Sequence, residues 1–459
     1  MAKISLMAYG KLSNGEAYAT CGVNKRAKYD TFKLHRLPTD IVRAILSRLP
    51  FKEAARTSLV SRRWRRLWRC YPKLILTRDT MLHGNTTNNN PTHIQVTFIG
   101  RVNSVVRQLK SATLSKFVVK FPLLQRDAHH IDRWVSLSVE SRARRIILDL
   151  CPETEDIDRN DDMYNFPCIC SPVMIVGFTN LKKLGLHMVS ISGDLQCLLP
   201  HCDVLEWLSL TCCSLQNLSI SRPLCRLRYL RVQHCTLQKL DMQAPNLKEF
   251  ELTNYPIPLV LGECLNLSVA TIMLLSSEDC FDYVSAELPA VLCHVQDSVS
   301  ISLTIRNEVR GSAEGVARFN NLKHLILNID VQGYSGTGSG ILRLASLLKL
   351  APVLEELELN MYNASPPIYI RQLDKTSMLC PHTHLRIVRM TGFYGIRGQL
   401  ELALHILRSV SGLERMIIDP MVRVAWGPCL DMVQAHLMEW GRIMAQLRLR
   451  EYRRIVTIL

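Results

Sequence analysis

Apolar residues first recur with a helical spacing near residue 34, after about thirty residues that show no periodicity. Pro38 and two short polar residues, Thr39 and Asp40, precede apolar positions that share one helical face. The pattern predicts a short helix, which Pro50 ends because proline cannot donate the backbone hydrogen bond that continues a helix. The apolar positions of this helix are Ile41, Ile45, Leu46 and Leu49.

A second helical pattern runs over residues 52–68, with apolar residues three and four positions apart. It predicts one helix with a single buried stripe. A helical unit this short cannot bury so many large side chains by itself, and exposed apolar patches mark partner surfaces. We therefore expect part of the unit to bind another protein. The stripe comprises Ala55, Leu59, Val60, Trp64, Leu67 and Trp68.

Short strands and helices alternate in the next part of the chain. Strands are expected at residues 115–121 and 145–150, and helices at residues 102–109 and 131–139. An acidic run over residues 152–162 lacks the glycine and the fixed alternation of a calcium loop, so it predicts a solvated insertion.

A leucine repeat becomes explicit at residue 181, with the pattern L-x-x-L-x-L-x-x-N/C-x-L. Cys213 and Cys235 occupy the ninth position of their units, where a small side chain packs inside the repeat, so we expect core cysteines rather than metal ligands. Successive units lie 24, 22 and 20 residues apart. These units begin at Leu181, Leu205, Leu227 and Leu247.

Looser units follow at intervals of 32, 31 and 28 residues, which leave room for helices, expected at residues 341–350 and 400–410. In such a repeat each strand buries its apolar positions against its neighbours, and the intervening residues face a concave surface. The stacked strands therefore offer a long face to a partner. The looser units begin at Leu322, Leu354, Leu385 and Leu413.

The stretch LHRLPTDIVRAILSRLPFKEAARTSLVSRRWRRLW resembles an F-box. In its family, this helical motif docks on the Skp adaptor of SCF (Skp–cullin–F-box) ubiquitin ligases. A basic helical hairpin that makes its own core or contacts nucleic acid is the open alternative, and Trp64 and Trp68 would be core residues under either account. The resemblance implies an adaptor-facing surface made of Leu37, Pro38, Ile41, Ile45, Leu46, Leu49, Val60 and Trp64.

An F-box followed by leucine-rich repeats resembles plant F-box/leucine-rich-repeat proteins, and HLRIVRMTGFYGIRGQLELALHILRSVSGLERMIIDP resembles their C-terminal FBD-type module. The implied fold class is α/β: an N-terminal helical F-box, a leucine-rich-repeat solenoid of horseshoe shape and a C-terminal FBD-like module. The expected divisions are a flexible tail over 1–30, the F-box over 34–75, the solenoid over 95–370, the FBD-like region over 380–420 and a basic helical tail over 421–459.

The distribution of charge indicates what kind of partner the protein binds. Lys and Arg total 56 against 40 Asp and Glu, a net charge of +16 in 459 residues. Residues 33–73 hold twelve basic and two acidic residues, so this segment alone carries +10. Concentrated positive charge beside an apolar docking face attracts an acidic protein as readily as a phosphate backbone. The apolar content of 47% and a mean hydropathy of +0.06 indicate a folded, soluble protein.

Several classes of function are excluded by the sequence pattern. Sixteen cysteines without a secretory signal indicate reduced thiols, and we expect a location in the nucleus and/or cytoplasm, with no membrane span. The chain contains no nucleophile elbow, His-Glu-x-x-His helix or paired Cys-x-x-Cys, so no enzyme activity, metal or cofactor is expected. We expect His129, His130 and Asp132 to be surface residues at a helix start, and residues 333–340 to form a flexible glycine-rich loop.

The family resemblance implies a non-catalytic substrate receptor of a cullin-RING ubiquitin ligase. Such a receptor holds its target near the ubiquitin-charged enzyme and contributes effective concentration and orientation. The implied partners are a Skp-type adaptor, cullin through that adaptor, and an unidentified target protein on the concave repeat face. The alternatives are a leucine-rich-repeat interaction scaffold outside a ligase and, with less support, a basic nucleic-acid-binding protein.

Overall fold

A computed structural model gives the arrangement of most of the chain. The acidic run, the glycine-rich loop and the N-terminal tail, each a subject of the predictions above, lie wholly or mostly outside the described residues. The structure describes residues 37–82, 90–109, 114–152, 162–167, 176–191, 194–262, 264–276, 278, 280–306, 317–332, 339–363, 382–423 and 432–459.

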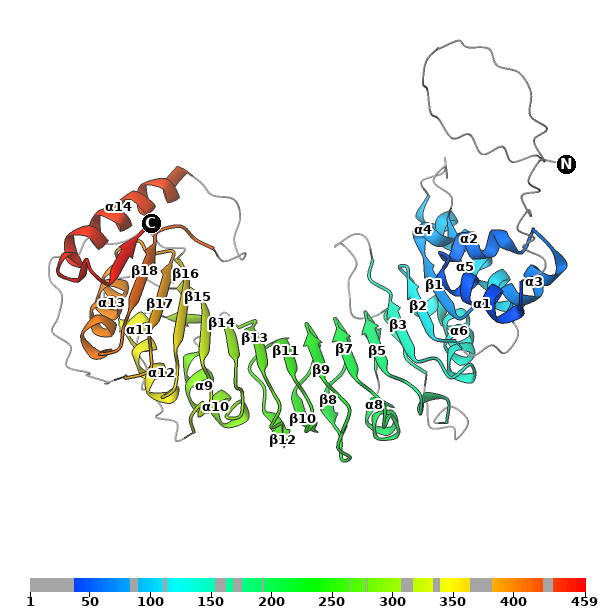
Figure 1. Cartoon of the computed structure of the whole chain (residues 1–459), viewed down its shortest axis with the longest axis horizontal. Coiled ribbons are helices and arrows are strands. Elements are labelled where there is room, and N and C mark those ends of the chain that lie inside the picture. The colour runs from blue at the N-terminus through cyan, green and yellow to red at the C-terminus, as the bar shows by residue number, and fades with distance from the viewer. Residues whose placement is uncertain are drawn as a thin grey trace, which may run out of the picture.

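One large parallel sheet runs through the molecule, and its strands follow one another in chain order along an open curve (Figure 1). Three helices precede it: α1 (Thr39–Arg48), α2 (Phe51–Thr57) and α3 (Arg62–Trp68). The strands in spatial order are β1 (Lys73–Thr77), β2 (Lys116–Lys120), β3 (Arg145–Asp149), β5 (Lys183–His187), β7 (Trp207–Thr211), β9 (Tyr229–Gln233), β11 (Glu249–Asn254), β13 (Val269–Leu274), β14 (Ser298–Arg306), β15 (His324–Gln332), β16 (Glu356–Asn363), β17 (Ile387–Thr391), β18 (Arg415–Asp419) and β19 (Val456–Ile458).

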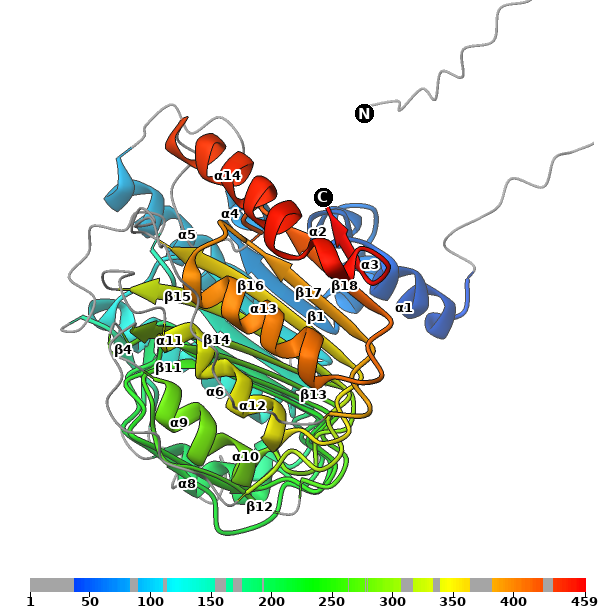
Figure 2. The ribbon, with the colours of Figure 1, turned by 90° about the vertical axis from the view of Figure 1, so that its left-hand side faces the viewer.

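Helices cover the outer side of the curve where the repeat is long enough to contain them (Figures 1 and 2). The first central unit, 24 residues long, still contains a short helix, and the shorter units that follow place short parallel strands there instead. These outer strands are β8 (Asn217–Ser219), β10 (Lys239–Gln243) and β12 (Leu259–Gly262), and a further pair is β4 (Tyr164–Asn165) with β6 (Val189–Ser190). The helices are α5 (Pro91–Gln108), α6 (Ala128–Glu140), α8 (Asp194–Leu198), α9 (Phe281–Ala286), α10 (Leu288–Val291), α11 (Ser339–Leu342), α12 (Leu344–Leu350) and α13 (Arg397–Ser409).

The core lies between the large sheet and this outer layer. In β9, Leu230 and Val232 are buried, while the alternate residues stay half exposed on the opposite, concave face. A residue with positive φ follows β5, β7 and β9 in turn, namely Met188, Cys212 and His234. This turn directs the next residue inward, as the leucine-rich pattern requires.

The core position predicted for the repeat cysteines and the strands predicted from the leucine spacing of the central repeats are confirmed. Cys213 and Cys235 are buried in the core, and the four central units form β5, β7, β9 and β11. The later four units form β15 to β18, with α12 and α13 in the predicted helical segments. Among the described residues, no group of three His, Cys, Asp or Glu side chains is placed to hold a metal ion.

Two parts of the predicted outline differ from the structure. The single helix expected over 52–68 is wrong, because the chain turns at residues 58–61 and forms α2 and α3 instead. Residues 421–459, expected as a helical tail, contain α14 (Met432–Arg448) but then pair β19 with β18, so the chain end extends the main sheet. No described helix has both the length and the apolar character needed to cross a bilayer.

Candidate adaptor-docking surface and concave face

The three N-terminal helices share a compact apolar core. Val42 and Leu46, one helical turn apart on α1, are buried there with Trp64 of α3. Phe51 and Trp68 meet edge to face at 5.3 Å between ring centroids. The core therefore uses one face of α1 and leaves the face that carries Ile41 to the solvent.

Polar contacts fix these helices to the first strand of the sheet. The Tyr71 hydroxyl donates a hydrogen bond of 2.8 Å to the carbonyl of Leu49, and burial raises its pKa. Lys73, the first residue of β1, donates from Nζ to the carbonyl of Ser47 at 2.8 Å. The short helix α4 (Arg78–Met81) packs against β1 as well. The helical unit therefore sits at a defined place on the end of the sheet.

Large apolar side chains are exposed on this unit. Ile41 is 48% exposed, Leu59 79% and Val60 65%. Arg63 donates from Nη2 to the Leu37 carbonyl and to the Thr39 hydroxyl, so the beginning of α3 lies beside the beginning of α1. The turn that carries Leu59 and Val60 leads directly into α3. The structure thus places exposed apolar side chains at the start of α1 and in the turn that leads into the neighbouring helix α3.

Six of the eight residues predicted for the adaptor surface are exposed or half exposed, and two are buried. Leu46 is only 2% exposed and Trp64 5%, so a partner cannot reach either side chain without unfolding the helical unit. The prediction that these two residues face the adaptor is therefore wrong, and both belong to the core. The other six are exposed or half exposed, and their part in adaptor binding stays a prediction: Leu37, Pro38, Ile41, Ile45, Leu49 and Val60.

Leu59 was missed as a surface residue, because helical periodicity placed it in a buried stripe. The break that exposes it has a local cause: the Ser61 side chain accepts a hydrogen bond of 3.3 Å from the backbone N–H of Trp64 and caps the start of α3. Serine is a preferred residue at a helix N-cap, so Ser61 was the available sequence signal for a new helix.

Positive charge surrounds this apolar surface. Arg62, Arg65 and Arg66 of α3 are exposed, and no described carboxylate pairs with them. The nearby Arg56 does have a partner, Glu53, at 2.6 Å. The outer side of α3 therefore offers several free cations to an acidic surface.

The concave face of the sheet begins with a line of basic residues in register. Lys73 on β1 pairs with Lys116 on β2, and Arg145 on β3 pairs with Lys183 on β5. Because Phe117 pairs with Ile146, Lys116 and Arg145 are also neighbours. We call these four residues the basic ladder. Among the described residues, Lys116 and Arg145 have no carboxylate partner.

Two aromatic residues continue the same line. Trp207 pairs with Tyr229, and their rings stack at 5.5 Å with an interplanar angle of 4°. Lys183 lies 5.9 Å from the Trp207 ring, within the range of a cation–π interaction. Trp207 packs across the neighbouring Gly185, where an added Cβ would approach the ring to 3.2 Å. We call Trp207 and Tyr229 the aromatic pair.

A charged cluster lies four residues further along the same strands. His187 Nδ1 is 2.9 Å from Asp149 Oδ1, and Lys120 Nζ is 3.2 Å from Asp149 Oδ2. The hydrogen bond from His187 lowers the pKa of Asp149. Hydrogen bonds to Asp149 and then Cys212 raise the pKa of His187 to about 9. His187 therefore carries a positive charge at neutral pH.

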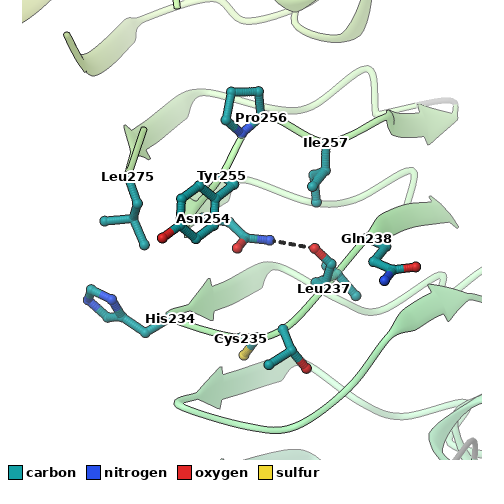
Figure 3. Close-up of a pocket in the computed structure, with 10 residues that line it drawn as sticks. His234, Cys235, Leu237, Gln238, Asn254, Tyr255, Pro256, Ile257 and Leu275 are labelled. Carbon is teal, nitrogen blue, oxygen red and sulfur yellow. Dashed lines mark hydrogen bonds between the residues drawn. The ribbon is translucent and has the colours of Figure 1, made fainter. Parts of the chain in front are cut away.

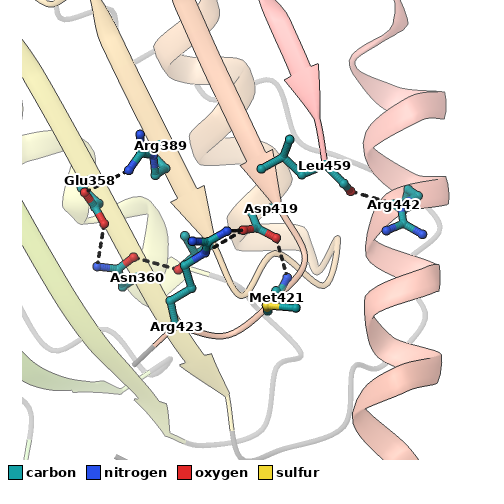
Figure 4. Close-up of polar contacts among 9 residues, drawn as sticks. Glu358, Asn360, Arg389, Asp419, Met421, Arg423, Arg442 and Leu459 are labelled. Carbon is teal, nitrogen blue, oxygen red and sulfur yellow. Dashed lines mark hydrogen bonds and ion pairs between the residues drawn. The ribbon is translucent and has the colours of Figure 1, made fainter. Parts of the chain in front are cut away.

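The far end of the concave face carries a hydrogen-bonded polar row instead (Figure 4). Asn360 donates from Nδ2 to Asn328 Oδ1 at 3.0 Å, and the Thr391 hydroxyl donates to Asn360 Oδ1 at 2.8 Å. Asp419 on β18 pairs with Arg423 at 2.7 Å. These groups satisfy one another, so this end offers fewer free charges than the basic ladder.

A pocket of about 600 Å³ opens among the loops that follow β9, β11 and β13 (Figure 3). Its walls are mostly apolar and include Tyr255, Ile257 and Leu275. Asn254 donates from Nδ2 to the Leu237 carbonyl at 3.0 Å and ties two of the loops together. The pocket is open to solvent.

Comparison with protein families agrees with both parts of this architecture. A model described as "F-box domain" matches residues 34–75, and one described as "At1g61320/AtMIF1, LRR domain" matches residues 168–452, more than half of the chain. The chain belongs to the plant F-box/leucine-rich-repeat family. Proteins of this family generally act as adaptors rather than enzymes.

Relatives of this F-box/leucine-rich-repeat protein occur in Arabidopsis thaliana. "F-box protein At5g03100" is 25% identical over 58% of this chain and 83% of its own length. "Putative F-box/FBD/LRR-repeat protein At5g56810" is 24% identical over 90% of this chain and 96% of its own length. "F-box/LRR-repeat protein At3g03360" is 25% identical, and the match covers 55% of this chain but 53% of that relative.

Proposed function

We propose that this protein is the substrate-recognition subunit of an SCF-type cullin-RING ubiquitin ligase. The observation that carries the proposal is the exposure of apolar side chains at the start of α1 and in the turn before α3, at Pro38, Ile41 and Val60. A Skp-type adaptor binds there and connects the chain to cullin. The free arginines of α3 favour an acidic adaptor surface.

The attachment of the helices to β1 supports a positioning role. Tyr71 and Lys73 join the F-box to the sheet through hydrogen bonds, so an adaptor on the F-box and a target on the concave face keep a constant geometry. A receptor of this kind accelerates ubiquitin transfer by proximity and orientation and performs no bond chemistry itself. The target protein binds the concave face of the repeats.

The same proposal includes the division of the chain into an F-box, a solenoid and a C-terminal module. The curved sheet corresponds to a leucine-rich-repeat horseshoe, and residues 380–420 correspond to an FBD-like module built on β17, α13 and β18. The F-box spans residues 34–75 and the solenoid includes residues 95–370. The complex acts in the nucleus and/or cytoplasm, which imaging of a fluorescent fusion in plant cells tests.

Co-expression with a Skp-type adaptor followed by size-exclusion chromatography tests the function. The variant carrying Ile41→Asp and Val60→Asp puts charge on the apolar surface without touching the core, so it should lose the adaptor complex. A matched control carries Val96→Asp on α5 and Leu447→Asp on α14, which are 64% and 66% exposed. The control should keep the complex.

An intact chain that remains monomeric with every adaptor offered would reject the ligase proposal. Two alternatives would then be separated by their partners. A steep salt dependence of binding to DNA or RNA would favour the nucleic-acid function. Adaptor binding without any ubiquitin transfer to a bound target would favour a scaffold outside the ligase.

A further inference from the structure

The basic ladder holds positive charge that the described part of the chain does not neutralise. Lys116 and Arg145 are half buried, adjacent, and without a carboxylate partner among the described residues. Burial, followed by the charges of Arg145 and Lys73, lowers the pKa of Lys116. An anionic ligand would relieve this repulsion, so the array is suited to bind negative charge.

The line of residues changes chemistry in an ordered way across the strands. The basic ladder on β1 to β5 leads into the aromatic pair on β7 and β9, and Glu249 and Glu251 then follow on β11. Glu251 already pairs with Arg231 at 2.8 Å. Carboxylates on β11 repel an anion that extends further. The site therefore has a basic part on β1 to β5, a flat apolar part on β7 and β9, and a boundary at β11.

We propose that the basic ladder and the aromatic pair bind an acidic, extended segment of a target protein. This inference rests on the proposed function and names the chemistry of the target. Six neighbouring strands about 4.8 Å apart span about 24 Å, which an extended segment of about seven residues covers. Its carboxylates face the ladder, and an aromatic or aliphatic side chain packs on Trp207 and Tyr229.

A protein segment fits this surface better than a nucleic acid does. The ladder offers only four cations in one row over about 14 Å, which is short for a backbone with a phosphate at every nucleotide. Glu249 on β11 is the next residue of the row after Tyr229 and would repel further phosphates. A short acidic segment ends before this carboxylate.

Fluorescence anisotropy with the full chain tests the proposal. The probe is a labelled seven-residue peptide with five glutamates followed by phenylalanine and glycine. The variant carrying Lys116→Glu and Arg145→Glu should bind it about tenfold or more weakly than the original chain. A control peptide with glutamine in place of glutamate should lose affinity to a similar extent.

A matched control variant separates the ladder from overall charge. Lys323→Glu with Arg415→Glu makes the same change in net charge, and Arg415 lies in the same register row of the sheet, on β18. This variant should bind the peptide within about twofold of the original chain. Trp207→Ala should weaken binding of the phenylalanine peptide but not of a version with glycine at that position.

Three results would overturn the proposal: no binding of the acidic peptide, equal binding by the ladder variant and the control variant, or tighter binding of single-stranded RNA or duplex DNA than of the peptide at physiological salt. Adaptor binding, measured by co-expression, is read separately, because the ladder substitutions leave the apolar F-box surface intact. Adaptor binding without peptide binding rejects the ladder proposal alone. Peptide binding without any adaptor complex rejects the ligase function instead.

Discussion

At the scale of single residues, the concave face contains a histidine with a raised pKa, His187. Its imidazole contacts Asp149 at 2.9 Å, and this hydrogen bond is the main reason that its pKa rises to about 9. An unperturbed histidine titrates near pH 6.5. Because the folded value is the higher one, the contribution to stability is complete below about pH 6.5 and disappears as pH rises through about 9.

The substitution His187→Gln tests this contribution. The original chain should lose stability relative to the variant between pH 6.5 and 9, by on the order of 1 kcal/mol, because the pair keeps some contact with water. Denaturant unfolding of both proteins at a series of pH values measures the difference. A stability difference that stays constant over this range would show that His187 is not protonated by its contact with Asp149.

At the scale of elements, α1 shows what the spacing of apolar residues predicts and what it does not. Spacing placed the helix correctly, but it grouped Ile41 with Leu46, although the first faces solvent and the second the core. Ile41 and Ile45 lie beside the buried Val42 and Leu46 on α1, so periodicity alone cannot tell which apolar residues face the core. The strands β13 and β14 were also missed, because Ala270 replaces a repeat leucine and the next unit is irregular.

Because Leu46 is buried and Ile41 is exposed, alanine substitutions at these two positions should affect stability and adaptor binding in opposite ways. Leu46→Ala should lower the free energy of unfolding by about 2–5 kcal/mol, because it leaves a cavity in the helical core. Ile41→Ala should change it by no more than about 0.5 kcal/mol and should instead weaken adaptor binding. Chemical denaturation and adaptor titration of both variants measure the four values. A large loss of stability from Ile41→Ala would contradict the assigned surface.

At the scale of the whole molecule, the F-box and the last strand occupy opposite ends of one curved sheet (Figure 1). Leucine spacing predicted the strands β5, β7, β9, β11 and β15 to β18, since each of them has its own apolar pattern. The pairing of β19 with β18 could not be predicted in this way, because a three-residue strand carries too little pattern. The in-register basic ladder also depends on strand pairing, so its residues are separated in the sequence.

Amide hydrogen exchange of the full chain, with and without a Skp-type adaptor, tests the central claim most directly. The adaptor should slow exchange at residues 37–45 and 58–62, which form the apolar surface, and leave the concave strands β5 to β11 unchanged. Protection confined to the concave strands, or no protection anywhere, would contradict the assignment of the F-box surface as the adaptor site.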